Sequence, residues 1–159
     1  MIKKIISDLS GVILFTRDRN FNGTLNGLYK KIKSEKKSFD FYDYFEFNEK
    51  LLRFYNDLKK DYSLNIYTLG SIQNNSAEVK NKLTPIFDNI YSAHELNLPK
   101  TDPNSYLALA NKLNCKPTEI IFIDDNVSNL EVATQVGLKT VQFADTDSTI
   151  SKLKELISL

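Results

Sequence analysis

Ile5-Ile6-Ser7-Asp8-Leu9-Ser10-Gly11 passes from apolar residues into a carboxylate and then into a glycine. An apolar run of this length, bounded by a glycine, predicts a short buried strand. A carboxylate at the end of such a strand is costly to bury without a cation or a chemical role. The pattern recurs where Ile120-Ile121-Phe122-Ile123 stops at Asp124-Asp125. If the two strands are parallel neighbours, three carboxylates converge at one sheet edge and repel one another unless a divalent cation lies among them.

The rest of the chain alternates helix and strand patterns around these two strands. Helices are predicted over residues 24–33, 49–61, 76–83, 103–113, 128–136 and 149–158, and further strands over residues 64–68, 87–91 and 139–143. Apolar strands that alternate with helices predict an α/β fold with a parallel sheet covered on both faces. Ligands bind such sheets at the carboxyl ends of the strands, where Asp8, Thr68, Asp124 and Asp125 fall.

Length and charge limit the number of domains and the kinds of partner. Residues 1–159 are enough for one α/β domain with a core and too few for two comfortable ones, so we expect a single domain. Lys and Arg total 21 and Asp and Glu total 20, and the formal net charge of +1 argues against nucleic acid and anionic membranes as partners. The single cysteine, Cys115, can form no intramolecular disulfide and lacks the spacing of a metal site.

The first residues superficially resemble a secretory signal, because Lys3 and Lys4 precede apolar residues. Asp8 interrupts that apolar region, and no small-residue cleavage site follows it. No stretch approaches the ~20 apolar residues that a membrane helix needs. A cytoplasmic protein is therefore expected.

Residues 16–48 have weaker apolar periodicity than their surroundings. Asn22 and Gly23 predict a turn there, and Thr24 is suited to cap a helix. Six aromatic residues follow: Phe39, Phe41, Tyr42, Tyr44, Phe45 and Phe47. Such a cluster more often forms a small core than a ligand pocket.

Four short segments, taken in order, resemble the sequence motifs of the haloacid dehalogenase superfamily of phosphatases and related hydrolases. They are Ile5-Ile6-Ser7-Asp8-Leu9-Ser10-Gly11-Val12, Ile66-Tyr67-Thr68, Lys100-Thr101-Asp102-Pro103 and Phe122-Ile123-Asp124-Asp125-Asn126. The resemblance covers nearly the whole chain outside residues 16–48. It implies the Rossmann-like fold of that superfamily, with residues 16–48 as a reduced cap inserted after the first strand.

The resemblance also implies a chemical role for the first and fourth motifs. Asp8 would be the nucleophile that forms an aspartyl-phosphate. Mg²⁺ would bind Asp8, the backbone carbonyl of Ser10 and Asp125. Asp124 and Asn129 would complete this metal site by supporting its ligands.

The second and third motifs would act on the transferred group. By resemblance, the hydroxyl of Thr68 would donate to a phosphoryl oxygen. Lys100 would screen the charge of Asp8 and of the phosphoryl group. The implied substrate is a phosphorylated small molecule or another accessible phosphoester.

Ser10 departs from the pattern, because phosphatases of this family usually carry a second aspartate there, which protonates the leaving alkoxide and then activates water. A serine is a poor general acid near neutral pH, and losing such a group typically costs ~10²- to 10⁴-fold in rate. Other branches, including some active phosphatases, phosphonate-cleaving enzymes and dehalogenases, also have a non-acidic residue there. Ser10 therefore predicts a good leaving group, a proton donor supplied by substrate or water, or a slow enzyme.

The short insertion and the residue after Lys100 are further departures. A reduced cap implies either an open site that admits a larger phosphorylated molecule, or closure by a second subunit and hence a homodimer through the aromatic cluster. Thr101 replaces the proline that usually follows the lysine, which should change local rigidity more than chemistry.

Several functions remain open from the sequence. The preferred one is a Mg²⁺-dependent phosphohydrolase, and the alternative is a catalytically weakened relative that binds a phosphorylated ligand or a protein partner. A phosphoacceptor signalling domain would place the acid pair before the phosphorylated aspartate, whereas here the single acid comes first. Dehalogenation would leave the metal-binding acid pair without a role.

Overall fold

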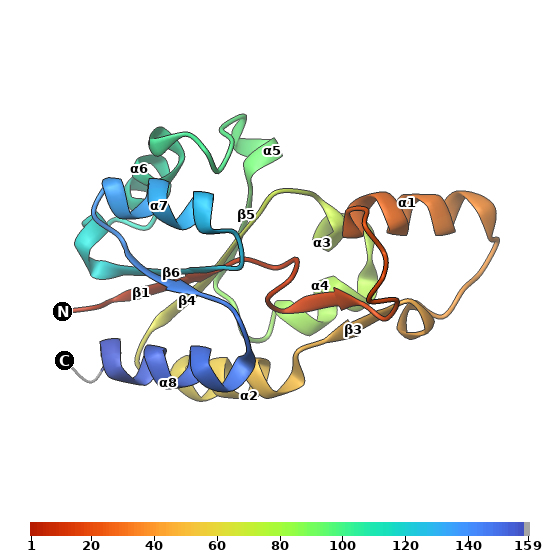
Figure 1. Cartoon of the computed structure of the whole chain (residues 1–159), viewed down its shortest axis with the longest axis horizontal. Coiled ribbons are helices and arrows are strands. Elements are labelled where there is room, and N and C mark those ends of the chain that lie inside the picture. Colours follow the sequence, from red (N-terminus) through yellow and green to blue (C-terminus); the bar gives the residue numbers. More distant parts are fainter. Residues whose placement is uncertain (158–159) are drawn as a thin grey trace.

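A parallel sheet forms the centre of this computed structural model, which describes residues 1–157 (Figure 1). Its five strands are β1 (Lys4–Ser7), β4 (Ser63–Thr68), β5 (Asn89–Ser92), β6 (Ile120–Asp124) and β7 (Lys139–Gln142), in the order β5-β4-β1-β6-β7. Every neighbouring pair is parallel. The predicted α/β fold is confirmed, and the two apolar runs are adjacent strands at the centre of the sheet.

Helices cover both faces of the sheet, because successive strand side chains point to opposite faces. Ile5 belongs to a core shared with α2 and α8, and the next residue, Ile6, belongs to a core shared with α6 and α7. The covering helices are α2 (Glu49–Leu58), α6 (Pro103–Lys112), α7 (Val127–Gln135) and α8 (Thr146–Ile157). Figure 1 shows α6 and α7 above the sheet and α2 and α8 below it.

Side-chain caps fix where several helices begin. Thr24 accepts a hydrogen bond from the amide of Gly27 at the start of α1 (Leu25–Glu35). Asp102 caps α6, whose first residue is Pro103, as predicted. Ser76 caps α4 (Ala77–Leu83), which ends before Pro85. The last helix, α8, begins three residues earlier than predicted, and its predicted end, Ser158, lies outside the described residues.

The sequence analysis missed a second sheet, in which β2 (Leu14–Thr16) pairs with β3 (Phe45–Phe47) in antiparallel orientation. Each strand has only three residues, too few for a visible alternation, and their pairing joins the two ends of the insertion. α1 and the 3-10 turn η1 (Phe41–Asp43) lie between them, and Figure 1 places this unit beyond the carboxyl ends of β1 and β4.

Half of the predicted aromatic cluster is core, as expected. The ring of Phe41 stacks on that of Phe45 with centroids 4.8 Å apart, and both belong with Phe47 to the apolar cluster that also contains Ile5. These three rings are buried within the protomer, whereas Tyr42 is 47% exposed.

Three very short elements were also missed, namely α3 (Ile72–Asn75), α5 (Ala93–Leu96) and η2 (Pro117–Glu119). They span about one turn each, so they show no periodicity in the sequence. Among residues 1–157, no helix is both long and apolar enough to cross a membrane.

Candidate active site

Three carboxylates converge where β1 and β6 end. The amide of Asp8 donates to the carbonyl of Ile123 at 2.7 Å, so the chain leaves β1 directly beside the end of β6. Oxygen atoms of Asp8, Asp124 and Asp125 all lie within 4.8 Å of one another. These oxygens are the donor type that Mg²⁺ takes in proteins, and two of the three side chains are buried.

Lys100 lies between two of these acids. Its Nζ is 2.7 Å from Oδ1 of Asp8 and 3.0 Å from Oδ2 of Asp124, and all three side chains are at most 10% exposed. The ammonium also lies 5.3 Å from the centre of the Tyr67 ring, where a cation is attracted to the ring face. The hydroxyl of Tyr67 donates to the carbonyl of Leu98, which ties the loop before Lys100 to the sheet.

Asp124 is fixed by its hydrogen bonds. Besides Lys100, it accepts from the amide of Asn126 at 2.8 Å and from the side chain of Asn129 at 3.1 Å. The side chain of Asn126 in turn caps α7. The acid therefore holds the end of β6 and the start of α7 in one arrangement, as a supporting residue beside a metal site would.

Gly11 lets Asp125 approach the first loop. The glycine has a φ of +78°, in the left-handed region, and a Cβ at this position would lie 2.6 Å from Oδ2 of Asp125. Any side chain here would displace the carboxylate. The glycine that bounds the first apolar run therefore also makes room for the acid.

Burial and neighbouring charge shift the ionisation of this cluster. Burial raises the pKa of Asp8 to about 7, although Lys100 acts in the opposite direction. Burial lowers the pKa of Lys100, but Asp8 and Asp124 outweigh that effect and hold it above its usual value. Burial, followed by the charge of Asp124, raises the pKa of Asp125. A divalent cation among the three carboxylates would favour their charged forms and relieve the repulsion between them.

Ser10 and Thr68 lie in different environments. Ser10 is partly buried and lines the cavity above Asp8. Thr68, at the end of β4, is 1% exposed, and its neighbour Leu69 reaches the cavity in its place. The hydroxyl of Thr68 has no hydrogen-bond partner within the described chain. A buried hydroxyl without a partner is costly, and the hydroxyls of Tyr55 and Ser105, which also lie outside the cavity lining, share this state.

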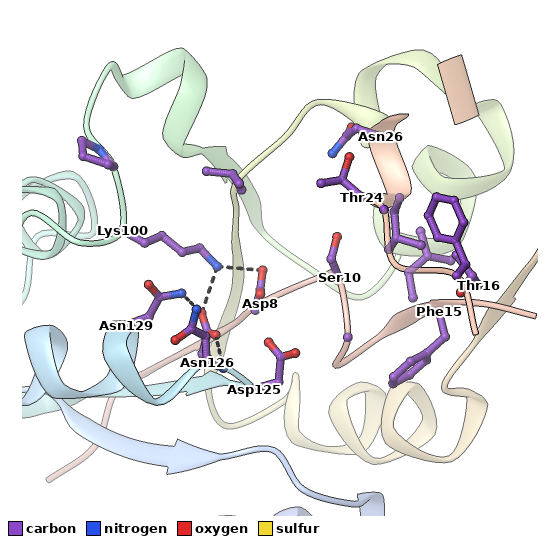
Figure 2. A pocket seen from close by; sticks show the side chains of 18 of the residues that line it. Asp8, Ser10, Phe15, Thr16, Thr24, Asn26, Lys100, Asp125, Asn126 and Asn129 are labelled. Carbon is purple, nitrogen blue, oxygen red and sulfur yellow. Dashed lines mark hydrogen bonds and ion pairs between the residues drawn. The ribbon is translucent and has the colours of Figure 1, made fainter. Parts of the chain in front are cut away.

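The cluster opens into a cavity of about 610 Å³ with two unlike walls. The charged wall consists of Asp8, Lys100, Asp124, Asp125 and Asn129. The uncharged wall consists of Phe15, Thr16, Phe21, Thr24, Asn26 and Leu69. Figure 2 shows Asp8 and Lys100 facing Thr24 and Asn26 across the cavity, with Ser10 between them.

The uncharged wall was missed by the sequence analysis. Asn26 of α1 accepts a hydrogen bond from the amide of Ser71, 45 positions away, at 3.0 Å. A Cβ on Gly70 would lie 1.8 Å from Nδ2 of Asn26, so the insertion touches the loop after Thr68 only because Gly70 has no side chain. The sequence holds no signal for a contact between two such distant polar residues.

Comparisons with known proteins agree with this geometry. Residues 5–143 match the family described as haloacid dehalogenase-like hydrolase. Enolase-phosphatase E1 of Pseudomonas fluorescens (strain Pf0-1) is 32% identical over 87 residues, which are 52% of this chain and 37% of that protein. The chain spans 14% to 39% of the length of the first curated relatives it matches.

Solved structures share the fold at low sequence identity. A predicted HAD-like family hydrolase from Porphyromonas gingivalis superposes with a TM-score of 0.71 at 17% identity, covering 100% of this chain and 99% of that one. A HAD family enzyme from Bacteroides thetaiotaomicron, in complex with magnesium and inorganic phosphate, gives a TM-score of 0.65 at 18% identity, with 89% and 94% covered. The family match covers residues 5–143 and includes the strands that carry the motifs. The chain therefore belongs to the haloacid dehalogenase-like hydrolases.

Proposed function

We propose that this protein is a Mg²⁺-dependent phosphohydrolase that acts through an aspartyl-phosphate at Asp8. The observation that supports this most is the position of Lys100, within 3.0 Å of both Asp8 and Asp124 in a cluster of three carboxylates. A relative named enolase-phosphatase and a structural neighbour solved with magnesium and inorganic phosphate are consistent with it.

Asp8 is the group suited to attack phosphorus. One of its oxygens is held by the amide of Leu9 at 2.7 Å and by Lys100, which fixes the direction of the carboxylate. Attack by an Asp8 oxygen would form the aspartyl-phosphate as the bond to the leaving oxygen breaks. Water would then attack the same phosphorus, which releases inorganic phosphate and restores the carboxylate.

Mg²⁺ would be held by Asp8, Asp125 and the backbone carbonyl of Ser10, and it would neutralise charge on the phosphoryl oxygens. The three close carboxylate oxygens fit such a cation, because without one they repel each other. Asn129 donates to Asp124, and Asp124 would hold Lys100 against Asp8 and so help to orient that ligand.

Lys100 and Thr68 would bind the transferred group. Lys100 would offer its remaining ammonium hydrogen to a phosphoryl oxygen while it bridges Asp8 and Asp124. The buried hydroxyl of Thr68, which lacks a partner within the described residues, would donate to another such oxygen. Residues 16–48 would act as a small cap, since Thr24 and Asn26 face Asp8 across the cavity (Figure 2).

The test is phosphate release from 4-nitrophenyl phosphate with and without Mg²⁺, followed by acid quenching and mass spectrometry of the protein. We expect release only with Mg²⁺, and phosphate attached at Asp8 in the quenched sample. The variant Asp8→Asn should abolish both signals, whereas Asp57→Asn, an exposed acid on α2, should change neither. Full activity in Asp8→Asn would refute the nucleophile assignment.

A second candidate is a protein that binds a phosphorylated ligand and turns it over poorly. Ser10 motivates it, because this position, which lines the cavity, offers no carboxylic acid. It predicts that phosphate binds in the presence of Mg²⁺ while no tested ester is hydrolysed. Turnover of several unlike phosphoesters at ordinary enzyme rates would exclude it.

A further inference from the structure

We propose that the substrate carries its phosphate on a leaving group that departs as a stable anion, namely a phenolate, an enolate or a carboxylate. We further propose that this leaving group is flat and largely apolar and lies against the uncharged wall. The inference rests on the proposed hydrolase and narrows its substrate class. Two observations carry it: the ionisable groups lie on one side of the cavity, and the other side combines the apolar side chains of Phe15, Phe21 and Leu69 with neutral polar groups.

The first observation concerns proton donors. Among the described residues that line the cavity, four have ionisable side chains: Asp8, Lys100, Asp124 and Asp125. All four belong to the charged wall. Lys100 forms ion pairs with Asp8 and Asp124, so these three side chains are already bound to one another. Nothing on the uncharged wall can give a proton to an alkoxide near neutral pH.

Ser10 lies where the two walls meet, so its hydroxyl is the protein group between Asp8 and the cap residues (Figure 2). A hydroxyl can donate a hydrogen bond to a departing oxygen, but it cannot protonate that oxygen. A leaving group that is already stable as an anion needs no proton from the protein, because its conjugate acid is strong enough.

The second observation concerns the shape and polarity of the uncharged wall. Leu69 is 61% exposed at the cavity, next to Thr68. The ring of Phe15 is held in place by Phe143, at a centroid distance of 6.1 Å, and by Arg19 over its face. The ring of Phe21 packs so closely on Gly23 that a Cβ there would lie 2.4 Å from it. Arg19 occupies one face of Phe15, so a flat ligand meets apolar area at Phe21, at the exposed Leu69 and at the remaining surface of Phe15.

Hydrogen-bonding groups on this wall are neutral. Thr16, Thr24 and Asn26 offer hydroxyl and amide groups, whereas the cations Arg19 and Lys30 lie outside the lining of this cavity. The wall therefore suits an aromatic or unsaturated body with hydroxyl or carbonyl substituents.

The chemical step balances without a protein acid. An Asp8 oxygen bonds to phosphorus, the bond from phosphorus to the leaving oxygen breaks, and that oxygen keeps the electron pair and departs as phenolate, enolate or carboxylate. Water then bonds to phosphorus, the bond from phosphorus to the Asp8 oxygen breaks, and phosphate leaves. The proton of that water goes to phosphate or to solvent.

The test of the leaving group is kcat/KM for phosphate release over substituted phenyl phosphates that differ in phenol pKa, with benzyl phosphate as an alkyl ester of similar shape. We expect the rate to fall steeply as the phenol becomes a weaker acid, and benzyl phosphate to be the slowest substrate. Ser10→Asp should raise the benzyl phosphate rate by about 10²- to 10⁴-fold, and far more than the 4-nitrophenyl phosphate rate. Ser10→Asn introduces a side chain of the same shape as aspartate but without an acidic proton, so it should give no such gain in rate.

The test of the wall needs no turnover. In the presence of Mg²⁺, phenylphosphonate should bind about tenfold or more tightly than methylphosphonate, as measured by calorimetry. Leu69→Ala should reduce this preference, whereas Leu107→Ala should not, because Leu107 is an exposed leucine on α6 outside the cavity. Thermal melts of each variant report whether it is folded.

The outcomes separate this inference from the proposed function. Equal rates for benzyl and 4-nitrophenyl phosphate, or equal affinity for the two phosphonates, would overturn the inference while the hydrolase assignment stands. No phosphate release from any of these esters would overturn the proposed function, and with it the leaving-group assignment.

Discussion

The charged and uncharged walls of the cavity are built from different parts of the molecule. The charged wall lies at the ends of β1 and β6, where Asp124 is fully buried and has protein partners for both of its oxygens. The uncharged wall comes mainly from the insertion and from Leu69, and several of its side chains are half-exposed. In the proposed hydrolase, the rigid sheet edge would carry the chemistry and the insertion would select the substrate.

The two walls also differ in their effect on the stability of the fold. Two buried acids and one exposed acid repel one another, so the charged wall lowers stability unless Lys100 and a cation compensate. The uncharged wall instead adjoins the apolar core, because Thr16 pairs with Phe45 and Phe45 is a core residue. Variants of the two walls should therefore differ in stability as well as in activity.

The largest expected effect is that of Lys100→Met. It should lower phosphate release by about 10³-fold or more. It should also destabilise the protein by about 3–5 kcal/mol at pH 8, because it leaves Asp8 and Asp124 buried without their cationic partner. Chemical denaturation and steady-state rates measure the two effects. Lys112→Met, an exposed lysine on α6, is the matched control, and equal behaviour of the two variants would contradict the assignment.

Mg²⁺ binding to the charged wall should depend on pH. The ligand carboxylates must be ionised, and the pKa of Asp8 is raised to about 7. We therefore expect the Mg²⁺ affinity to increase by up to about tenfold per pH unit between pH 5 and pH 7 and to level off above that. Titration calorimetry in the absence of substrate measures it. The same affinity at pH 5.5 and pH 8 would show that Asp8 is not a ligand.

Asp8→Asn should stabilise the metal-free protein while it abolishes activity. Because the folded pKa of Asp8 is about 7 and its unfolded value is lower, wild-type stability falls as pH rises towards 7 and then stops falling. The variant lacks this loss, so its melting temperature at pH 8 should be higher, on the order of 5 °C. The difference in melting temperature between the variant and the wild type should vanish near pH 4. A lower melting temperature for Asp8→Asn at pH 8 would show that the ion pair with Lys100 outweighs the cost of burying the ionised Asp8 carboxylate.

The smallest expected effect concerns the contact between the two halves of the site. Gly70→Ala should displace Asn26 and break its 3.0 Å hydrogen bond to Ser71, which should raise KM several-fold and leave kcat nearly unchanged. In the Asn26→Ala variant, the methyl group added by Gly70→Ala no longer meets the Asn26 side chain, so Gly70→Ala should raise KM little further. Additive effects of the two substitutions would show that the clash is not with Asn26.

The sequence predicted the sheet side of the molecule better than the insertion. Continuous apolar runs and capped helices depend on neighbours in the chain, so β1, β6 and α6 were predicted within a few residues. β2 and β3 were missed because each is short and is stabilised by pairing across the whole insertion. The contact between Asn26 and Ser71 was missed for the same reason.

The sequence alone determined the fold class, the family and the acids at the strand ends, because these follow from local periodicity and from short motifs around Asp8 and Asp124. Tertiary structure decided the rest. It placed Lys100 between two acids, buried Thr68, exposed Leu69 and set an uncharged wall opposite Ser10. Those features depend on distances between residues far apart in the chain, and such distances exist only once the chain is packed.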